Sequence, residues 1–301
     1  MVSVSQFLHE LAPDPWLPER SGQHTHSRER VLVKKALFGV IAGSAILVLG
    51  FFWANQWLAF RETRRDLRQM FFSMIRPVRL TNCTLERFGS EHDGGYLMCS
   101  NLLGQSQVGY SYGIAGDDNW GCDVSKRYKI TVHEYDCFDP RRPSCPGGSL
   151  NFHNECVGPS ASRDGSGVFD SVTNQIVHNA DAGKHIIMKM DVEGAELDSL
   201  LAVPDEQLDR IEQLAIELHK IDSPKSIQLE EKLEKTFYVA YVHANNYACH
   251  NAAPPFSSEA NELLFVNKRL ATVNTKDTSV PSSPLAAANN PQVPDCQPTW
   301  P

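Results

Sequence analysis

Short apolar runs alternate with amphipathic stretches through the middle of the chain, the pattern of strands and helices that build a parallel sheet. Strands are predicted at residues 108–112, 130–135, 152–157, 186–190 and 213–218. Helices are predicted at residues 119–128 and 170–179. Another helix is predicted after Ser223, which can cap it, with Pro224 in its first turn. Two late strands, at 237–242 and 262–266, can form an antiparallel hairpin at the sheet edge. The pattern therefore predicts an α/β domain.

One apolar segment near the N-terminus is much longer than any of these strands. Residues 36–60 contain no charged residue, and a helix of that length crosses the roughly 30 Å hydrocarbon core of a bilayer. Trp53 and Trp57 lie near its end, where aromatic side chains favour the membrane interface. A buried core helix rarely stays uncharged for so long, and a cleaved signal peptide has a shorter apolar stretch nearer the start. We therefore expect a signal-anchor helix in a lipid bilayer.

The amino-acid composition changes along the chain and indicates five parts. The expected parts are a short disordered tail (1–35), the anchor (36–60), a stem (61–80), one folded domain (81–269) and a disordered tail (270–301). The last part is rich in Pro, Ala, Asn, Ser and Thr and has too little apolar surface to order itself. The formal net charge of −8 disfavours nucleic acid as a partner, because a protein that binds phosphates is usually basic.

Cysteine usage indicates the compartment, since basic residues flank the anchor on both sides and the positive-inside rule nearly cancels. All eight cysteines follow the anchor, and an even number on one side suits an oxidising compartment. Asn82-Cys83-Thr84 is an N-glycosylation sequon. Together these features favour a single-pass type II protein of the Golgi or endoplasmic reticulum with a lumenal domain. Disulfides are favoured over free buried thiols, and their pairing stays open.

Polar residues gather at the carboxyl ends of the predicted strands, where open α/β sheets bind ligands. Gly113 and Gly116 follow the first strand, where a ligand must approach the backbone closely. Asp136 ends the second strand and can accept hydrogen bonds from both hydroxyls of a ribose, with Asp139 as a competing candidate. The full GxGxxG fingerprint is absent, which argues against a nicotinamide enzyme.

The segment KMDVEGAE, residues 189–196, brings three carboxylates to one strand-to-helix turn. Acids this close raise one another's pKa or share a cation. The alternative is helix capping, because Asp191 and Glu193 near a helix N-terminus interact favourably with its dipole.

This segment resembles the KIDVEGAE signature of FkbM-type methyltransferases, and further matches resemble the related methyltransferase-like 24 group. The matches, in family order, are Asp93-Gly94-Gly95-Tyr96, residues 112–117 (YGIAGD), residues 135–139 (YDCFD) and Glu217-Leu218-His219. The resemblance implies a Rossmann-like, seven-stranded sheet with helices on both faces that uses S-adenosyl-L-methionine. It also implies methyl transfer to oxygen, on a sugar or other small hydroxylated acceptor. The residues expected at the cofactor are Asp93, Tyr96, Gly113, Gly116, Asp117, Asp136, Asp139 and Asp191.

Methyl transfer from a sulfonium to a hydroxyl is an in-line displacement that needs positioning and a general base. His219 is the first candidate base, because the imidazole pKa lies near working pH; a structural histidine is the alternative. Asp191 and Glu193 are further candidate bases. Asp191, Glu193 and Glu217 are also expected as ligands if a divalent cation orients and acidifies the hydroxyl. The alternative function is a membrane-anchored binding protein that keeps the fold without catalysis.

Overall fold

The structure is a computed structural model that describes residues 52–53, 56–165, 167–251 and 254–300. The chain divides into two compact units, Met1–Phe60 and Arg61–Pro301. Within the described residues no helix is both long and apolar enough to cross a membrane. The expected tail at 1–35 and most of the expected anchor, residues 36–51, lie outside those residues.

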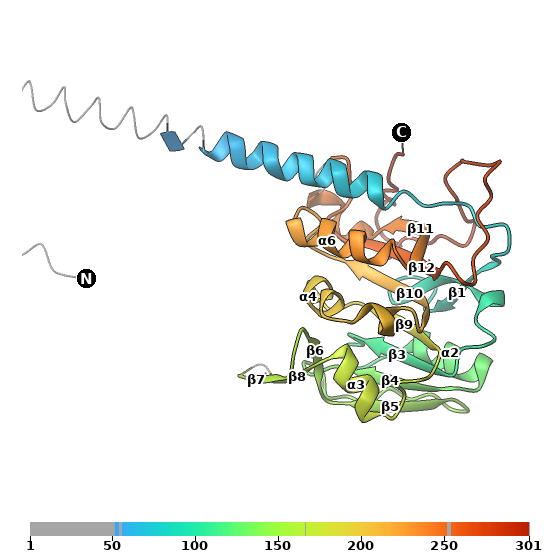
Figure 1. The fold of residues 1–301 in the computed structure, drawn as a ribbon. Coiled ribbons are helices and arrows are strands. Elements are labelled where there is room, and N and C mark those ends of the chain that lie inside the picture. The colour runs from blue at the N-terminus through green and yellow to red at the C-terminus, as the bar shows by residue number, and fades with distance from the viewer. Residues whose placement is uncertain (1–51, 54–55, 166, 252–253, 301) are drawn as a thin grey trace, which may run out of the picture. The chain divides into compact units, whose positions relative to one another are not determined.

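A seven-stranded sheet forms the centre of the second unit (Figure 1). Across the sheet, the strands are β11 (Phe237–Ala244), β12 (Asn261–Asn267), β10 (Ile211–Leu218), β9 (Ile186–Met190), β3 (Val108–Tyr112), β4 (Thr131–Tyr135) and β5 (Ser149–His153). Neighbours from β10 to β5 run parallel, whereas β12 is antiparallel to both of its neighbours. A mostly parallel α/β sheet is thus confirmed, and β3 and β9 have the predicted bounds.

Two strand predictions need correction. The strand expected at 152–157 is two strands, because the chain leaves the large sheet after β5. The second one, β6 (Cys156–Gly158), joins β7 (Ser162–Asp164) and β8 (Gly167–Ser171) in a separate three-stranded sheet. The late strands do pair antiparallel, but β12 is inserted between β11 and β10. Its run of buried apolar residues suits a strand covered on both faces, so β11 forms the sheet edge.

Helices lie on both faces of the sheet, in unequal number. One face packs in a single apolar cluster against α3 (Val172–His178), α4 (Glu196–Leu201), α5 (Asp205–Leu208), α6 (Pro224–Leu233) and the end of the helix at residues 56–74. The other face is covered by α2 (Asn119–Tyr128) and by a hairpin of β1 (Leu85–Gly89) and β2 (Gly95–Cys99). Two short 3-10 helices are η2 (Ser100–Leu102) and η3 (Asn246–Asn251).

Local sequence signals explain several of these helix bounds. The predicted helix at 119–128 is α2, and the side chain of Asp118 caps it by accepting from the backbone N–H of Gly121. Ser223 caps α6 in the same way, as predicted. Helix α3 begins later than predicted, at Val172, because the preceding residues form β8. The hairpin of β1 and β2 was not predicted, and its turn contains the Asp93-Gly94 pair.

The order of the strands reverses between β3 and β9. The chain passes from β3 to β4 and β5 on one side, and then crosses to β9 on the other side of β3. The carboxyl ends of β3 and β9 therefore lie at the point of reversal, which is where open α/β sheets bind ligands.

Disulfides join all eight cysteines, and each lies in the described part of the chain. The pairs are Cys83–Cys99, Cys122–Cys145, Cys137–Cys156 and Cys249–Cys296. Four disulfides fit a secreted or lumenal protein, as predicted.

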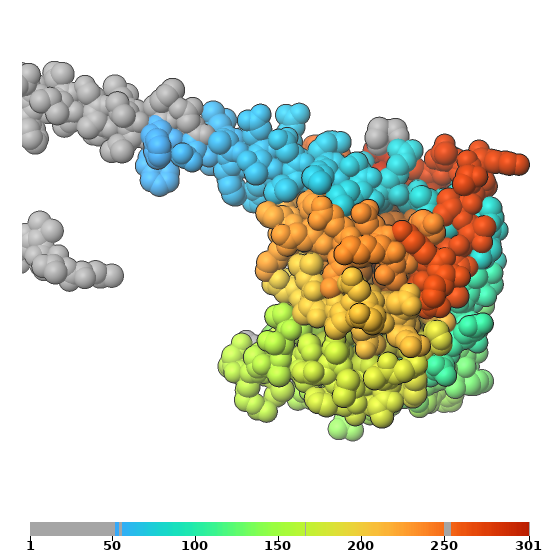
Figure 2. Space-filling view, in the orientation of Figure 1, coloured from blue at the N-terminus to red at the C-terminus, as the bar shows by residue number. Residues whose placement is uncertain are grey.

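The C-terminal segment differs from the disorder predicted for residues 270–301. As far as Trp300 it is an irregular chain that lies on the second unit, red in Figure 2. Cys296 is bonded to Cys249, and the ring of Trp300 stacks on Phe72 at 4.1 Å. External anchors therefore order a segment that cannot form its own core. The start of the C-terminal segment also contacts the sequon: Asn82 Nδ2 donates to the Leu270 carbonyl at 2.8 Å.

Candidate functional site

The loop after β3 packs closely on the loop after β9. Gly113 has a φ of +72°, and a Cβ atom there would lie 1.6 Å from the backbone oxygen of Asp191. Only glycine fits this position. Gly116 has a φ of +79°, and a Cβ there would meet the guanidinium of Arg141 at 2.7 Å. Both glycines are thus required by the backbone.

The side chain of Asp136 fixes the same loop. Its Oδ2 accepts hydrogen bonds from the backbone N–H groups of Ile114 at 3.1 Å and Ala115 at 2.8 Å. Its Oδ1 accepts from those of Phe138 at 2.8 Å and Asp139 at 3.0 Å. An ionised carboxylate has about four lone-pair positions, and these four amides use them all. Asp136 therefore positions two loops, and a hydrogen bond to a ribose would have to replace one of the amides.

A cavity of about 480 Å³ lies at the carboxyl ends of these strands; we call it the β4-side cavity. Its lining includes these residues singled out in the sequence: Asp93, Gly113, Asp136, Asp139, Asp191 and Glu193. Apolar side chains of Phe138, Val157 and Phe169 complete the wall. The ring of Phe138 is 76% exposed, unusual for an apolar side chain of this size unless something covers it. Gly113, Asp136 and Asp191 thus share one cavity.

A smaller cavity of about 210 Å³ adjoins it and contains Asp117 among its lining residues, together with Asp93, Gly113 and Asp191. Tyr96 and Gly116 line none of these cavities. The carboxylate of Asp139 is paired with the Arg141 guanidinium, which lowers the pKa of Asp139.

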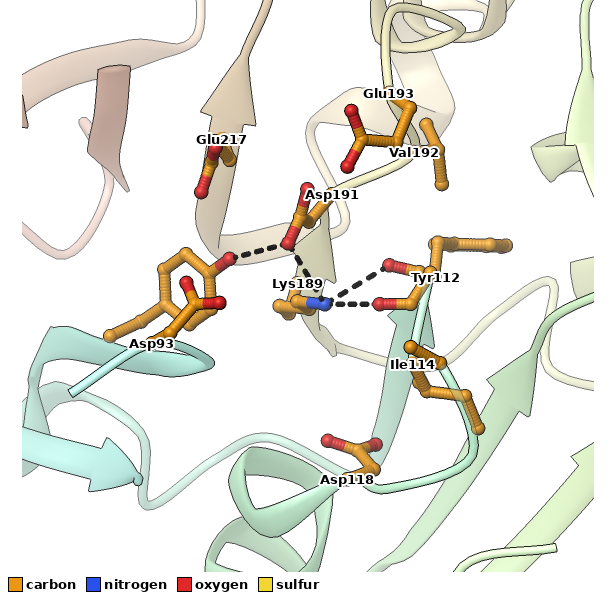
Figure 3. Close-up of polar contacts among 12 residues, drawn as sticks. Asp93, Tyr112, Ile114, Asp118, Lys189, Asp191, Val192, Glu193 and Glu217 are labelled. Carbon is orange, nitrogen blue, oxygen red and sulfur yellow. Dashed lines mark hydrogen bonds and ion pairs between the residues drawn. The ribbon is translucent and has the colours of Figure 1, made fainter. Parts of the chain in front are cut away.

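Asp191 lines both of these cavities, and Figure 3 shows its contact with Lys189. The hydroxyl of Tyr96 donates to Asp191 Oδ2 at 3.1 Å, and Lys189 Nζ lies 3.7 Å from the same oxygen. Lys189 also donates to the backbone oxygens of Gly113 at 2.5 Å and Tyr112 at 3.3 Å. Burial raises the pKa of Tyr96, and the charge of Asp191 raises it further, so the hydroxyl stays protonated and donates.

A third cavity, of about 650 Å³, opens beside Asp191; we call it the β10-side cavity. Asp93, Glu193, Glu217, His219 and Asn245 are among its lining residues. Glu217 is the penultimate residue of β10 and is 5% exposed. Asn245 Nδ2 donates to both of its carboxylate oxygens, at 2.9 and 3.1 Å. Burial raises the pKa of Glu217, and the charge of Asp191 raises it further.

His219 is held between buried and exposed carboxylates. Its Nδ1 lies 3.0 Å from Oε1 of Glu196, a side chain that is 0% exposed. Its Nε2 lies 3.5 Å from an oxygen of Glu217 and 3.5 Å from one of Glu193. Burial lowers the pKa of His219, but the hydrogen bond to Glu196 and the surrounding negative charges outweigh it and raise the pKa to about 9. A carboxylate holds Nδ1, and Nε2 faces the cavity between Glu193 and Glu217; this arrangement suits a general base and equally a metal ligand.

The group of possible cation ligands in the structure differs from the predicted group in one residue: His219 takes the place of Glu193. The ligand atoms of Asp191, Glu217 and His219 all lie within 4.8 Å of one another. The side chain of Glu193 is instead 89% exposed; its carboxylate lies 3.5 Å from His219 Nε2 but does not belong to this group. Carboxylate and imidazole ligands together suit divalent cations such as Mn²⁺ or Zn²⁺, so the residues present fit a cation.

Sequence reasoning missed three residues that shape this site. Glu196 was noted only as the third acid of its motif, and nothing in the pattern indicates that it faces His219. Lys189 is a single polar residue in a strand that is otherwise apolar, and no sequence motif singles out Asn245. Each acts through a contact between distant segments, which a local pattern does not encode.

No protein-family model matches this chain, and a comparison with curated proteins finds no match either.

Proposed function

We propose that this protein is an S-adenosyl-L-methionine-dependent methyltransferase that methylates a hydroxyl oxygen of a sugar or other small hydroxylated acceptor. One observation carries the proposal. Gly113, Asp136 and Asp191 line one cavity, at the point where the strand order of a mostly parallel sheet reverses. The resemblance of the KMDVEGAE segment to FkbM-type methyltransferases supports it.

The β4-side cavity suits the cofactor. Its volume of about 480 Å³ lies within the usual range for small-molecule sites. The exposed ring of Phe138 offers a face on which an adenine can stack, because aromatic rings stack on bases. Asp136 can accept from a ribose hydroxyl only in place of one of its four backbone amides, and Asp139 is the alternative. Asp191 places a carboxylate on the wall shared with the β10-side cavity, where a cationic sulfonium is favoured.

The β10-side cavity suits the acceptor and the proton transfer. His219, when neutral, accepts the acceptor's proton at Nε2, and Glu196 at Nδ1 stabilises the imidazolium that forms. S-adenosyl-L-methionine, when bound, would supply the methyl group from a sulfonium that leaves as a neutral thioether, so the protein would not need to stabilise a charged leaving group. Because the pKa of His219 is raised to about 9, most of it is protonated at pH 7, and turnover should rise with pH.

A divalent cation on Asp191, Glu217 and His219 is the other way to activate the hydroxyl, since a bound cation acidifies an oxygen that it contacts. His219 is then a ligand rather than the base. Dialysis against a chelator separates the two. If turnover survives dialysis, His219 is the general base that accepts the proton. If turnover is lost and returns when Mn²⁺ is added, the cation activates the hydroxyl.

The proposed function is tested by incubating the purified full chain with methyl-tritiated S-adenosyl-L-methionine and a panel of methyl glycosides. We expect tritium in at least one glycoside, and none with the matched variant Asp191→Asn. Cofactor binding without transfer to any panel member would favour the non-catalytic binding protein. Absence of cofactor binding would refute the cofactor itself.

We propose that the protein is held in the membrane by residues 36–60, with the second unit in the lumen of the Golgi or endoplasmic reticulum. The large exposed aromatic side chains of Trp53 and Trp57 and the four disulfides support this arrangement. Protease added to sealed microsomes should leave the second unit intact, and digestion without detergent would contradict its lumenal position.

A further inference from the structure

Residues 285–296 form an extended segment on the surface, which we call the C-terminal strap; it belongs to the red segment of Figure 2. Its central side chain, Asn289, is 2% exposed although the strap has no regular secondary structure. A buried polar side chain in an irregular surface segment needs partners, because leaving it unpaired is costly. The strap contacts the two loops that wall the β10-side cavity, and Asn289 itself contacts Asp93 in one of them and Glu262 on β12.

The first loop is the turn of the hairpin between β1 and β2. Arg87 donates to the carbonyl of Leu285 at 3.1 Å, and His92 Nδ1 lies 2.9 Å from the carbonyl of Ala288. Asn289 Nδ2 donates to Asp93 Oδ1 at 3.2 Å. Asp93 lines all three cavities of the candidate site, so the strap holds a site side chain directly.

The second loop follows β11. Asn246 Nδ2 donates to the carbonyl of Asn290 at 2.8 Å, and its Oδ1 accepts from the backbone N–H of Asn290 at 2.7 Å. Three residues later, Cys249 is bonded to Cys296 at the end of the strap. The neighbouring Asn245 holds Glu217, and Tyr247 and Ala248 line the β10-side cavity. The strap is therefore fixed to both sides of that cavity.

The charges around Asn289 explain why an amide occupies this position. Its Nδ2 also donates to Glu262 Oε1 at 2.6 Å, so one amide bridges two carboxylates that would otherwise repel each other. His243 lies between Glu262 and Asp295 of the strap, at 3.4 Å from each. Position 289 therefore needs a side chain that donates a hydrogen bond and carries no negative charge.

We propose that the C-terminal strap is a positioning element for the acceptor half of the site, with Asn289 as the residue that sets the place of Asp93. The proposal rests on the function proposed above. The β4-side cavity shares only Asp93 with these contacts, and its other walls come from the loops after β3, β4 and β9 and from the small sheet. Acceptor binding should therefore depend on the strap much more than cofactor binding does.

Asn289→Ala tests this inference in the full chain. The lost hydrogen bonds to Asp93 and to the buried carboxylate of Glu262 should raise KM for the most active methyl glycoside of the panel about tenfold, or more. The Kd for S-adenosylhomocysteine should stay within about twofold. Hydrogen–deuterium exchange should become faster in peptides holding the Gly95 and Ala248 amides, and stay unchanged at Ile114 and Ala115, which Asp136 holds.

Asn289→Asp keeps the shape but adds a third negative charge, and should raise KM further than Asn289→Ala. Cys249→Ser/Cys296→Ser frees the other end of the strap and should give the same pattern. Gln292→Ala, an exposed position of the same strap, is the matched control and should change nothing.

Unchanged KM and unchanged exchange in Asn289→Ala and in the double cysteine variant would overturn the inference. So would an equal loss of acceptor and cofactor affinity with faster exchange throughout the chain. If the wild type binds no S-adenosylhomocysteine, the proposed function fails. The exchange rates then still decide whether the strap positions the Asp93 loop.

Discussion

The two large cavities on either side of Asp191 are built in different ways. In the β4-side cavity, the carboxylate of Asp136 is fully engaged by four backbone amides, and apolar side chains complete the wall. In the β10-side cavity, carboxylates outnumber their cationic partners, and burial raises the pKa of Glu217. The first is a rigid, shaped site, and the second is a charged site in which protons or a cation can move. This division suits a cofactor on one side and proton transfer on the other.

Asp191→Asn should have the largest effect, because Asp191 belongs to both cavities. The variant keeps the shape, but it removes the charge that faces Tyr96 and Lys189. We expect turnover in the tritium assay to fall about 10³-fold, and cofactor affinity to fall as well. An active variant would mean that the two cavities do not meet in one reaction. Asp198→Asn is a suitable control, since that acid is exposed on α4.

His219→Gln should damage the β10-side cavity alone. We expect turnover to fall about 10²-fold with unchanged affinity for S-adenosylhomocysteine. Wild-type turnover should rise with pH up to about 9, where His219 loses its proton, and this limb should vanish in the variant. Equal pH profiles would exclude His219 as the base.

The same residue links pH to stability. The folded state raises the pKa of His219 from 6.5 to about 9, so its stabilising contribution is complete below the lower value and is lost as pH rises through the higher one. Urea unfolding between pH 6 and pH 10 should show a smaller decline in the free energy of unfolding for His219→Gln than for the wild type.

Asp136→Asn should damage the β4-side cavity alone. An amide cannot accept from all four backbone N–H groups, so the two loops that it joins should loosen. We expect affinity for S-adenosylhomocysteine to fall about tenfold by calorimetry. Unchanged affinity would move the ribose contact to Asp139, and Asp139→Ala is the comparison.

Phe138→Ala should have the smallest effect. Because its ring is 76% exposed, thermal unfolding should be nearly unchanged. Loss of one stacking face should weaken cofactor binding about fivefold. Equal affinity in wild type and variant would remove the ring from the adenine subsite.

Periodicity was sufficient to predict the centre of the fold. Buried parallel strands read as continuous apolar runs, so β3 and β9 were predicted with their bounds. Long-range pairing was not predictable in this way. The insertion of β12 depends on contacts with two strands, and the C-terminal segment is ordered by Cys249 rather than by its own composition.

The candidate site shows the same limit. The acids at strand ends could be predicted, because carboxyl ends of parallel strands meet at one edge. The partners of those acids could not. Two of the amides that Asp136 binds come from the loop after β3, and Glu196 faces His219 from 23 residues away, both as results of tertiary packing. The grouping of His219 with Asp191 and Glu217 depends on tertiary packing as well.

The central claim is that the β4-side cavity binds an adenosyl sulfonium. Calorimetric titration of the purified full chain with S-adenosyl-L-methionine and, separately, with a nicotinamide dinucleotide tests it most directly. We predict one-to-one binding of the sulfonium, weakened in Asp136→Asn, and no heat from the dinucleotide. No heat from the sulfonium, or binding of the dinucleotide in its place, would contradict the claim.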